Sequence, residues 1–258
     1  MILAIDIGNT NIVLGCIEGE QIITEARMAT DVLKTSDQYC VDLKNMLDLL
    51  EVDRKAIEGS IISSVVPPVL NSFKTAVIKL TGKVPLVVGP GIKTGLNILL
   101  DNPAMAGGDL IVAAVAALAE YEPPLLVVDM GTATTMIALD SKGSFLGGSI
   151  FPGVKISAES LSGRTAQLPA ISLEAPKKAI GRNTIDCMRS GVMMGHAAML
   201  DGMIERMEAE LGSPVTVVAT GGIARFILPM CRREMIYDRD LLLKGLRILY
   251  QNNIKKRR

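Results

Sequence analysis

The chain has 258 residues, 49% of them hydrophobic and 21% charged, so it is long and apolar enough to bury a substantial core. Lysine plus arginine equals aspartate plus glutamate at 27 each, which leaves no net charge to attract nucleic acid or an anionic membrane. Aromatic residues make up 3% and tryptophan is absent, so stacking surfaces for single-stranded nucleic acid are scarce.

Cysteine spacing and the apolar segments indicate the compartment. The four cysteines form no CxxC pair and no Cys/His ligand pattern, which favours a reduced protein over a disulfide framework or a zinc site. No basic segment precedes the apolar residues 1–5, unlike a signal peptide, and the longest apolar stretch, residues 110–119, is too short to span a bilayer. We expect a cytoplasmic protein with no membrane or nucleic-acid partner, whose basic end at residues 255–258 is solvated and frayed.

The first part of the chain alternates predicted strands and helices. Strands are expected at residues 2–5, 12–14, 60–66 and 84–88, with a short one near 97–100. Helices are expected at residues 35–51, from Pro67 to about Gly82, and from about Gly108 to Tyr121.

The second part begins by repeating the first. Asp6-Ile7-Gly8-Asn9-Thr10 follows one apolar run, and Asp129-Met130-Gly131-Thr132-Ala133-Thr134 follows another; each then returns through a second apolar run. Later elements are a long helix at residues 185–211, a strand at 215–219 and a last helix at about 240–252. We predict an α/β protein with two similar halves, residues 1–118 and 119–258, whose mixed sheets are flanked by helices.

The two turns suggest nucleotide binding. Gly, Thr and Asn let backbone N–H groups and hydroxyls approach an anion closely, and the Asp beside each turn can hold a cation that accompanies it. A third glycine-containing loop, Thr220-Gly221-Gly222, follows a later strand. A plain tight turn explains one copy equally well, but two copies in matched contexts favour a nucleotide held in a cleft between the halves.

Two common nucleotide signatures are set aside. No G-x-x-x-x-G-K-[ST] sequence occurs in the chain, so it is not a P-loop enzyme. The segment Gly89 to Gly95 has its third glycine one residue late for a dinucleotide fingerprint, and we interpret it as a glycine-rich loop.

Further motifs, combined with the two turns, resemble the type III pantothenate kinases almost from end to end. They are Ser64-Val65-Val66-Pro67, Asn102-Pro103 with Gly107 and Asp109, Gly147-Gly148-Ser149-Ile150-Phe151-Pro152-Gly153, Arg164-Thr165-Ala166 with Leu168-Pro169, and Gly181-Arg182-Asn183-Thr184. The resemblance implies the RNase H-like, actin-like ATPase fold in each half. It also implies a homodimeric enzyme that phosphorylates the primary hydroxyl of pantothenate with ATP, the first step of coenzyme A biosynthesis.

The resemblance assigns roles to individual positions. ATP phosphates would lie on the first turn, formed by Asp6, Ile7, Gly8, Asn9, Thr10, Asn11, Ile12 and Val13. Thr132 would contact the other side of the triphosphate, and Gly221 and Gly222 would form the adenosine loop. Asp6 would lie near Mg²⁺, and Asp129 would hold a monovalent cation, K⁺ or NH₄⁺.

The acceptor site implied by the resemblance consists of Leu100, Gly107, Gly108, Asp109, Leu110 and Thr184. Asp109 would be the general base, because phosphoryl transfer needs a carboxylate to accept the hydroxyl proton. The alternative for Asp109 is a helix N-cap, and the nearby helix N-terminus is expected to keep its carboxylate ionised.

The acceptor site departs from the family at three positions. The family usually has Tyr, Glu and Arg where this chain has Leu100, Met105 and Leu110. Loss of an Arg that can pair with a carboxylate should weaken binding of an anionic substrate. The alternatives are therefore a non-catalytic relative, such as an accessory regulator that keeps the ATP site, or a kinase for a less polar alcohol.

The single histidine, His196, invites a catalytic role. It shares a helical stripe with Val192, Met199 and Met203, so we interpret it as a core or interface residue.

Overall fold

The computed structural model describes residues 1–254 as two compact units. The first unit contains Met1–Leu96, Asp101–Ala119 and the chain from Asp240 onward, and the second contains Asn97–Leu100 and Glu120–Arg239. The predicted halves placed everything after residue 118 in the second half. The last helix lies in the first unit instead, because it packs on the first sheet. The predicted frayed end at residues 255–258 lies outside the described residues.

The first unit is built on a five-stranded mixed sheet in the order β3-β2-β1-β4-β5. Its strands are β1 (Ile2–Ile7), β2 (Asn11–Glu18), β3 (Gln21–Ala29), β4 (Gly59–Ser64) and β5 (Leu86–Val87). The first three form an antiparallel meander, and β4 and β5 run parallel to β1. The predicted strand at residues 84–88 is thus reduced to two paired residues.

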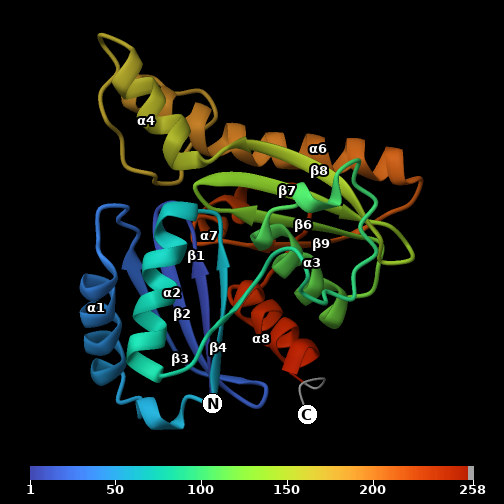
Figure 1. The fold of residues 1–258 in the computed structure, drawn as a ribbon. Coiled ribbons are helices and arrows are strands. Elements are labelled where there is room, and N and C mark those ends of the chain that lie inside the picture. Colours follow the sequence, from blue (N-terminus) through green and yellow to red (C-terminus); the bar gives the residue numbers. More distant parts are fainter. Residues whose placement is uncertain (255–258) are drawn as a thin grey trace. The chain divides into compact units, whose positions relative to one another are not determined.

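Helices cover both faces of this sheet (Figure 1). On one face lie α1 (Ser36–Leu49) and α2 (Pro67–Thr81). A capping box between Thr35 and Gln38 begins α1, whereas α2 begins with proline and ends at Gly82 in the left-handed conformation. Short 3₁₀ turns lie at Arg54–Ala56 (η1) and Pro103–Met105 (η2).

The other face of the sheet carries α8 (Leu241–Ile254), which in turn crosses α3 (Gly108–Glu120). Glycines make these close approaches possible. A Cβ on Gly15 of β2 would lie 2.8 Å from the side chain of Leu243, and one on Gly245 would meet the carbonyl oxygen of Val112. The C-terminal helix is therefore part of the first core.

The second unit repeats the topology of the first. Its sheet has the order β10-β9-β6-β7-β8, so β6, β7 and β8 form the antiparallel meander and β9 and β10 run parallel to β6. The strands are β6 (Leu125–Met130), β7 (Ala133–Leu139), β8 (Phe145–Pro152), β9 (Thr216–Thr220) and β10 (Ile236–Tyr237). The predicted pair of similar α/β halves is confirmed at the level of strand order.

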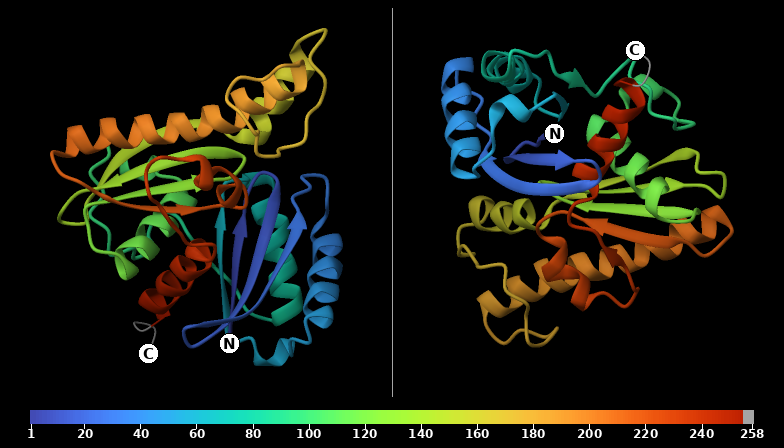
Figure 2. Two further views of the ribbon diagram at one scale, coloured as in Figure 1. Left: turned by 180° about the vertical axis from the view of Figure 1, so that it is seen from behind. Right: turned by 90° about the horizontal axis from the view of Figure 1, so that it is seen from below.

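One long helical segment lies along a face of the second sheet (Figure 2). It consists of α5 (Thr184–Arg189), a π-helical turn, η3 (Ser190–Met194), and α6 (Gly195–Leu211). The prediction of a helix over residues 185–211 is confirmed, but its π turn was not foreseen. The remaining helices of the unit are α4 (Val154–Arg164), α7 (Ala224–Ile227) and the 3₁₀ turn η4 (Leu228–Met230).

Residues 97–100 do not form the short strand that their sequence predicts. They make one isolated bridge, in which Ile98 pairs with Phe145 of β8. Among the described residues, no helix combines the length and apolarity needed to cross a membrane.

Candidate active site

The first acidic turn joins β1 to β2. Gly8 donates its backbone N–H to the carbonyl oxygen of Asn11 at 3.0 Å, and Thr30, the residue after β3, donates its hydroxyl to the carbonyl oxygen of Gly8 at 2.6 Å. Asn9, Thr10 and Asn11 are exposed at the tip. The turn therefore has a fixed backbone and a polar, accessible apex, as anion binding requires.

Two of the residues assigned to ATP binding face away from this apex. The side chains of Ile7 and Ile12 are fully buried in the first core, and Val13 is half-buried. These residues anchor the hairpin, so any contact of Ile7 or Ile12 with a nucleotide has to come from the main chain.

Asp6 lies at the end of β1, level with Ser63 on the parallel strand β4. Ser63 is fully buried, and its hydroxyl has no hydrogen-bond partner in the described structure. A carboxylate beside an unsatisfied hydroxyl offers oxygen donors of the kind that Mg²⁺ prefers. No group of three or more His, Cys, Asp or Glu side chains among the described residues is arranged to hold a metal ion.

Asp109 is the second residue of α3. Its carboxylate accepts the backbone N–H of Leu110 at 2.9 Å, and the absence of a side chain on Gly107 leaves room for Oδ1. Because the helix already begins at Gly108, Asp109 lies inside the first turn rather than at the N-cap. The carboxylate therefore accepts a hydrogen bond within the first turn of α3 but does not occupy the N-cap position.

The helix N-terminus was expected to keep the Asp109 carboxylate ionised, and burial acts against this effect. Burial raises the pKa of its carboxyl above the ordinary value, and the backbone hydrogen bonds at the helix N-terminus offset this only in part. A carboxylate with a raised pKa is a better proton acceptor than an ordinary aspartate.

Ser63 also lies near the start of α3. A Cβ on Gly108, the residue before Asp109, would lie 3.4 Å from the Ser63 hydroxyl oxygen. Ser63 is therefore level with Asp6 on β1 and close to Gly108 on α3. The sequence analysis did not single out Ser63, and only the strand register reveals its position.

The predicted acceptor residues are divided between the units. Gly107, Gly108, Asp109 and Leu110 begin α3 in the first unit, and Met105 is exposed in η2. Leu100 belongs to the second unit, where it packs near Gly147, and Thr184 is exposed at the start of α5.

The second acidic turn is one residue shorter than the first and is also closed by the N–H of its glycine. Gly131 donates its N–H to the carbonyl oxygen of Ala133 at 3.0 Å, and Gly153 donates to the carbonyl oxygen of Thr132 at 3.1 Å. Asp129 pairs in register with Thr220 at the end of β9. The structure thus brings the second acidic turn and the predicted adenosine loop together within one unit.

Gly221, the residue after β9, occupies a position that only glycine fits. Its φ is +95°, and a Cβ there would lie 2.5 Å from the carbonyl oxygen of Met130, while Gly222 follows in an exposed position.

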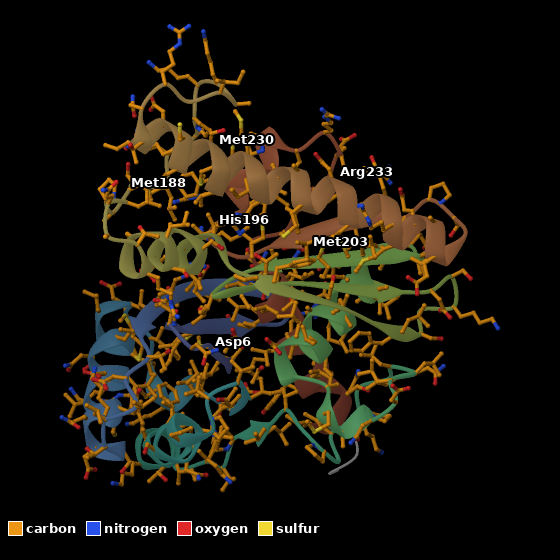
Figure 3. The ribbon with its side chains drawn as sticks, turned by 90° about the horizontal axis from the view of Figure 1, so that it is seen from above. Asp6, Met188, His196, Met203, Met230 and Arg233 are labelled. Carbon is orange, nitrogen blue, oxygen red and sulfur yellow. The ribbon has the colours of Figure 1, made fainter. Side chains whose placement is uncertain are left out.

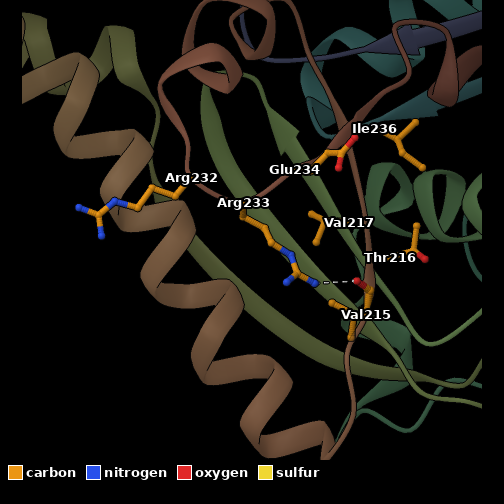
Figure 4. A pocket seen from close by; sticks show the side chains of 7 residues that line it. All are labelled: Val215, Thr216, Val217, Arg232, Arg233, Glu234 and Ile236. Atoms are coloured by element: carbon orange, nitrogen blue, oxygen red, sulfur yellow. Dashed lines mark hydrogen bonds between the residues drawn. The ribbon is translucent and has the colours of Figure 1, made fainter.

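A pocket of about 530 Å³ lies elsewhere on the second unit and contains none of the predicted site residues (Figure 4). It is lined by Val215, Thr216, Val217, Arg232, Arg233, Glu234 and Ile236. The Arg233 guanidinium is already engaged, because it forms an ion pair with Glu208 and donates to the carbonyl oxygen of Val215 at 3.1 Å. Arg233 therefore connects the segment between η4 and β10 to α6 and to Val215, the residue before β9.

Two solved structures show which known fold this chain has. The activator of the 2-hydroxyisocaproyl-CoA dehydratase from Clostridium difficile, with bound ADPNP, gives a TM-score of 0.60 at 14% identity, covering 99% of this chain and 96% of that chain. An inorganic polyphosphate/ATP-glucomannokinase from Arthrobacter sp. strain KM gives 0.51 at 14% identity, covering 98% of each chain. The fold is that of the actin-like and sugar-kinase ATPases.

Sequence comparison then gives the family. The family model for type III pantothenate kinase matches residues 2–206. A type III pantothenate kinase from Exiguobacterium sp. strain AT1b is 46% identical over 255 residues, which cover 99% of this chain and 100% of the relative. The chain belongs to the type III pantothenate kinase family.

Proposed function

We propose that this protein transfers the γ-phosphoryl group of ATP to the primary hydroxyl of pantothenate, the first step of coenzyme A biosynthesis. The observation that carries this proposal is the family match, which extends over residues 2–206 and is accompanied by 46% identity to a relative along almost the whole chain. The duplicated acidic turns support it, since each has its glycine N–H fixed and an aspartate as the last residue but one of the strand before it.

In this proposal the turns bind ATP. The turn from Gly8 to Asn11 offers the exposed amide and hydroxyl side chains of its last three residues to the phosphates, and Thr132 offers a hydroxyl from the second turn. Gly221 and Gly222 are assigned to adenosine by resemblance to the family; they form the loop after β9, in which Gly222 is exposed.

Asp109 accepts the proton of the acceptor hydroxyl. Burial raises the pKa of its carboxyl, which makes it a stronger base than an exposed aspartate. Its bond to the Leu110 N–H fixes the carboxylate orientation, so that the reaction depends mainly on positioning.

Asp6 supplies one carboxylate for Mg²⁺, and Ser63 lies beside it as a second oxygen donor. Bound Mg²⁺ would neutralise charge on the phosphates and take its remaining ligands from them and from water. Asp129 is assigned to the monovalent cation, K⁺ or NH₄⁺, by resemblance to the family. Homodimer formation and a cytoplasmic location are proposed on the same basis.

An ADP-release assay tests the proposal. With Mg²⁺, ATP and K⁺ or NH₄⁺ present, we expect steady ADP release that requires pantothenate. Asp109→Asn should lower kcat by about 100-fold or more, since a general base contributes roughly 10²–10⁴. Glu122→Gln, which changes an exposed carboxylate outside the site, should retain full activity. Wild-type turnover by Asp109→Ala would contradict the assignment of the base.

The apolar residues Leu100, Met105 and Leu110 favour one second candidate, a relative that keeps ATP binding and lacks acceptor chemistry. The same assay separates the two. Binding of ATP without turnover on pantothenate or any pantetheine-like alcohol would establish the regulator, whereas turnover on a less polar alcohol alone would establish a change of substrate.

A further inference from the structure

His196 is buried on the inner side of α6, in the segment that also carries Met188 and Met203 (Figure 3). The interpretation as a core residue is therefore confirmed. Its ring does more than fill space in the core, because its two nitrogens face backbone carbonyl oxygens of two different elements of the second unit.

The first contact is within the helix. Nδ1 lies 2.6 Å from the carbonyl oxygen of Val192, which belongs to the π turn η3. A π turn departs from the regular i→i−4 pattern of backbone bonds, and such turns are frequent at functional sites. The ring thus fixes itself to the irregular part of the helix.

The second contact reaches the end of the neighbouring strand. Nε2 lies 3.2 Å from the carbonyl oxygen of Pro152, the last residue of β8. Pro152 pairs in register with Ala133, the first residue of β7. His196 therefore holds the strand end that lies directly opposite the second acidic turn.

The residue after Pro152 connects this contact to Thr132. Gly153 donates its N–H to the carbonyl oxygen of Thr132 at 3.1 Å, and a Cβ on Gly153 would lie 2.7 Å from the carbonyl oxygen of Gly131. Gly153 also begins α4, since its carbonyl accepts the N–H of Ser157 at 2.9 Å. A shift of Pro152 would be transmitted to the turn because the two backbones are in close contact.

We propose that His196 is a positioning residue for nucleotide binding, an inference that rests on the proposed role of Thr132 in contacting ATP. The imidazole connects the π turn of the long helix to the Pro152–Gly153 corner, and the corner fixes the main chain of Thr132. His196 does not touch the nucleotide; it acts through Pro152 and Gly153.

The chemistry of the ring makes its two contacts separable. A neutral imidazole carries hydrogen on one nitrogen only, so it donates either to Val192 or to Pro152, and both bonds form together only in the doubly protonated ring. The positioning role requires hydrogen on Nε2. The side-chain nitrogen of asparagine occupies roughly the place of Nδ1, and that of glutamine the place of Nε2. His196→Asn thus keeps the contact to Val192, and His196→Gln keeps the contact to Pro152.

These two variants carry the same amide group and differ by one methylene. We expect His196→Asn to raise the Kd and KM for ATP by about two- to tenfold, the effect of one lost hydrogen bond, with KM for pantothenate unchanged. His196→Gln should bind ATP as the wild type does. The free energy of unfolding of both variants is measured alongside, so that a loss of ATP affinity is separated from a loss of stability.

A second readout does not depend on nucleotide. Hydrogen exchange at the Gly153 amide, which donates to Thr132, should be faster in His196→Asn and unchanged in His196→Gln. Because the chain has one histidine, its ring nitrogen signals in NMR spectra report directly on both contacts.

The results separate this inference from the proposed function. If the wild type binds ATP and the two variants bind equally, or if His196→Gln is the weaker, the positioning role is refuted. If the wild type binds no ATP, the proposed function is refuted together with the nucleotide role of His196. A difference in Gly153 exchange in that case would show that the ring still orders the turn.

Discussion

Replacement of Gly153 by alanine tests how closely the β8–α4 corner is packed on the second acidic turn. Gly153 has φ −65° and ψ 160°, a conformation that alanine adopts without strain. Any effect therefore comes from the added methyl group. That group would lie 2.7 Å from the carbonyl oxygen of Gly131 and closer still to that of Thr132.

The size of the effect follows from two terms. The methyl group has to move by about 0.7 Å or more to reach ordinary contact with Gly131, and overpacking of this kind costs about 1–3 kcal/mol. The hydrogen bond from Gly153 to Thr132 is lost or stretched, which costs about 1 kcal/mol. We expect Gly153→Ala to lower the free energy of unfolding by about 2–4 kcal/mol.

Urea unfolding followed by far-ultraviolet circular dichroism measures this change, since the chain has no tryptophan for fluorescence. Gly163→Ala is the control, because Gly163 lies in the same helix α4 and no atom lies within 4 Å of the position of an added Cβ. It should stabilise the protein by up to about 1 kcal/mol. If Gly153→Ala were as stable as Gly163→Ala, the close approach of the corner to the turn would be refuted.

Three further predictions follow from other residues. Burial raises the pKa of Asp109, so the charged carboxylate lowers the free energy of unfolding as pH rises through the folded-state pKa. Asp109→Asn should therefore be more stable than the wild type at neutral pH, and the difference in stability should vanish below about pH 3.9. A difference that stays constant with pH would contradict this prediction. Burial raises the pKa of Cys16 to about 11, so a thiol reagent should modify the exposed Cys187 rapidly and Cys16 only on unfolding; equal rates would rule this out. Asp6→Asn should raise the Mg²⁺ concentration for half-maximal ADP release by about tenfold or more, and an unchanged Mg²⁺ titration would remove Asp6 from the metal site.

The duplicated hairpin made the fold predictable from sequence. An Asp-x-Gly turn between two apolar runs specifies a short antiparallel connection, and two copies imply two sheets of the same strand order, as observed. The limits of α1, α2 and α3 were also close to the prediction because proline, glycine and a capping residue mark them.

Features that depend on distant contacts were missed. The helix α4 buries only Val154 and Ala158, so its sequence has little apolar periodicity to detect. The helix α8 can pack only on a sheet face that leaves space for its side chains. Gly15 and Gly59 leave that space on the first sheet, because they have no side chains of their own. The pKa of Asp109 depends on its burial, which a local sequence pattern does not report.

The candidate site was predictable as a set of turns, not as a set of contacting side chains. Asp6 and Asp129 were singled out because the repeat marks them. Gly153 belongs to a motif used for recognition and Ser63 to none, and the positions of both beside Thr132 and Asp6 require the strand register and the backbone hydrogen bonds. Ile7 and Ile12 show the converse, since they lie within the motif but face the core.

Because α8 completes the first core, the order of synthesis and the order of folding differ. Residues 120–239 of the second unit are contiguous in the chain and can fold as soon as they leave the ribosome. The earlier strands have to wait, with Gly15 and Gly59 uncovered, until Leu243 and Tyr250 have been made. A nascent chain halted before Leu241 would thus present an open sheet face to chaperones, although nearly all of its residues were already translated.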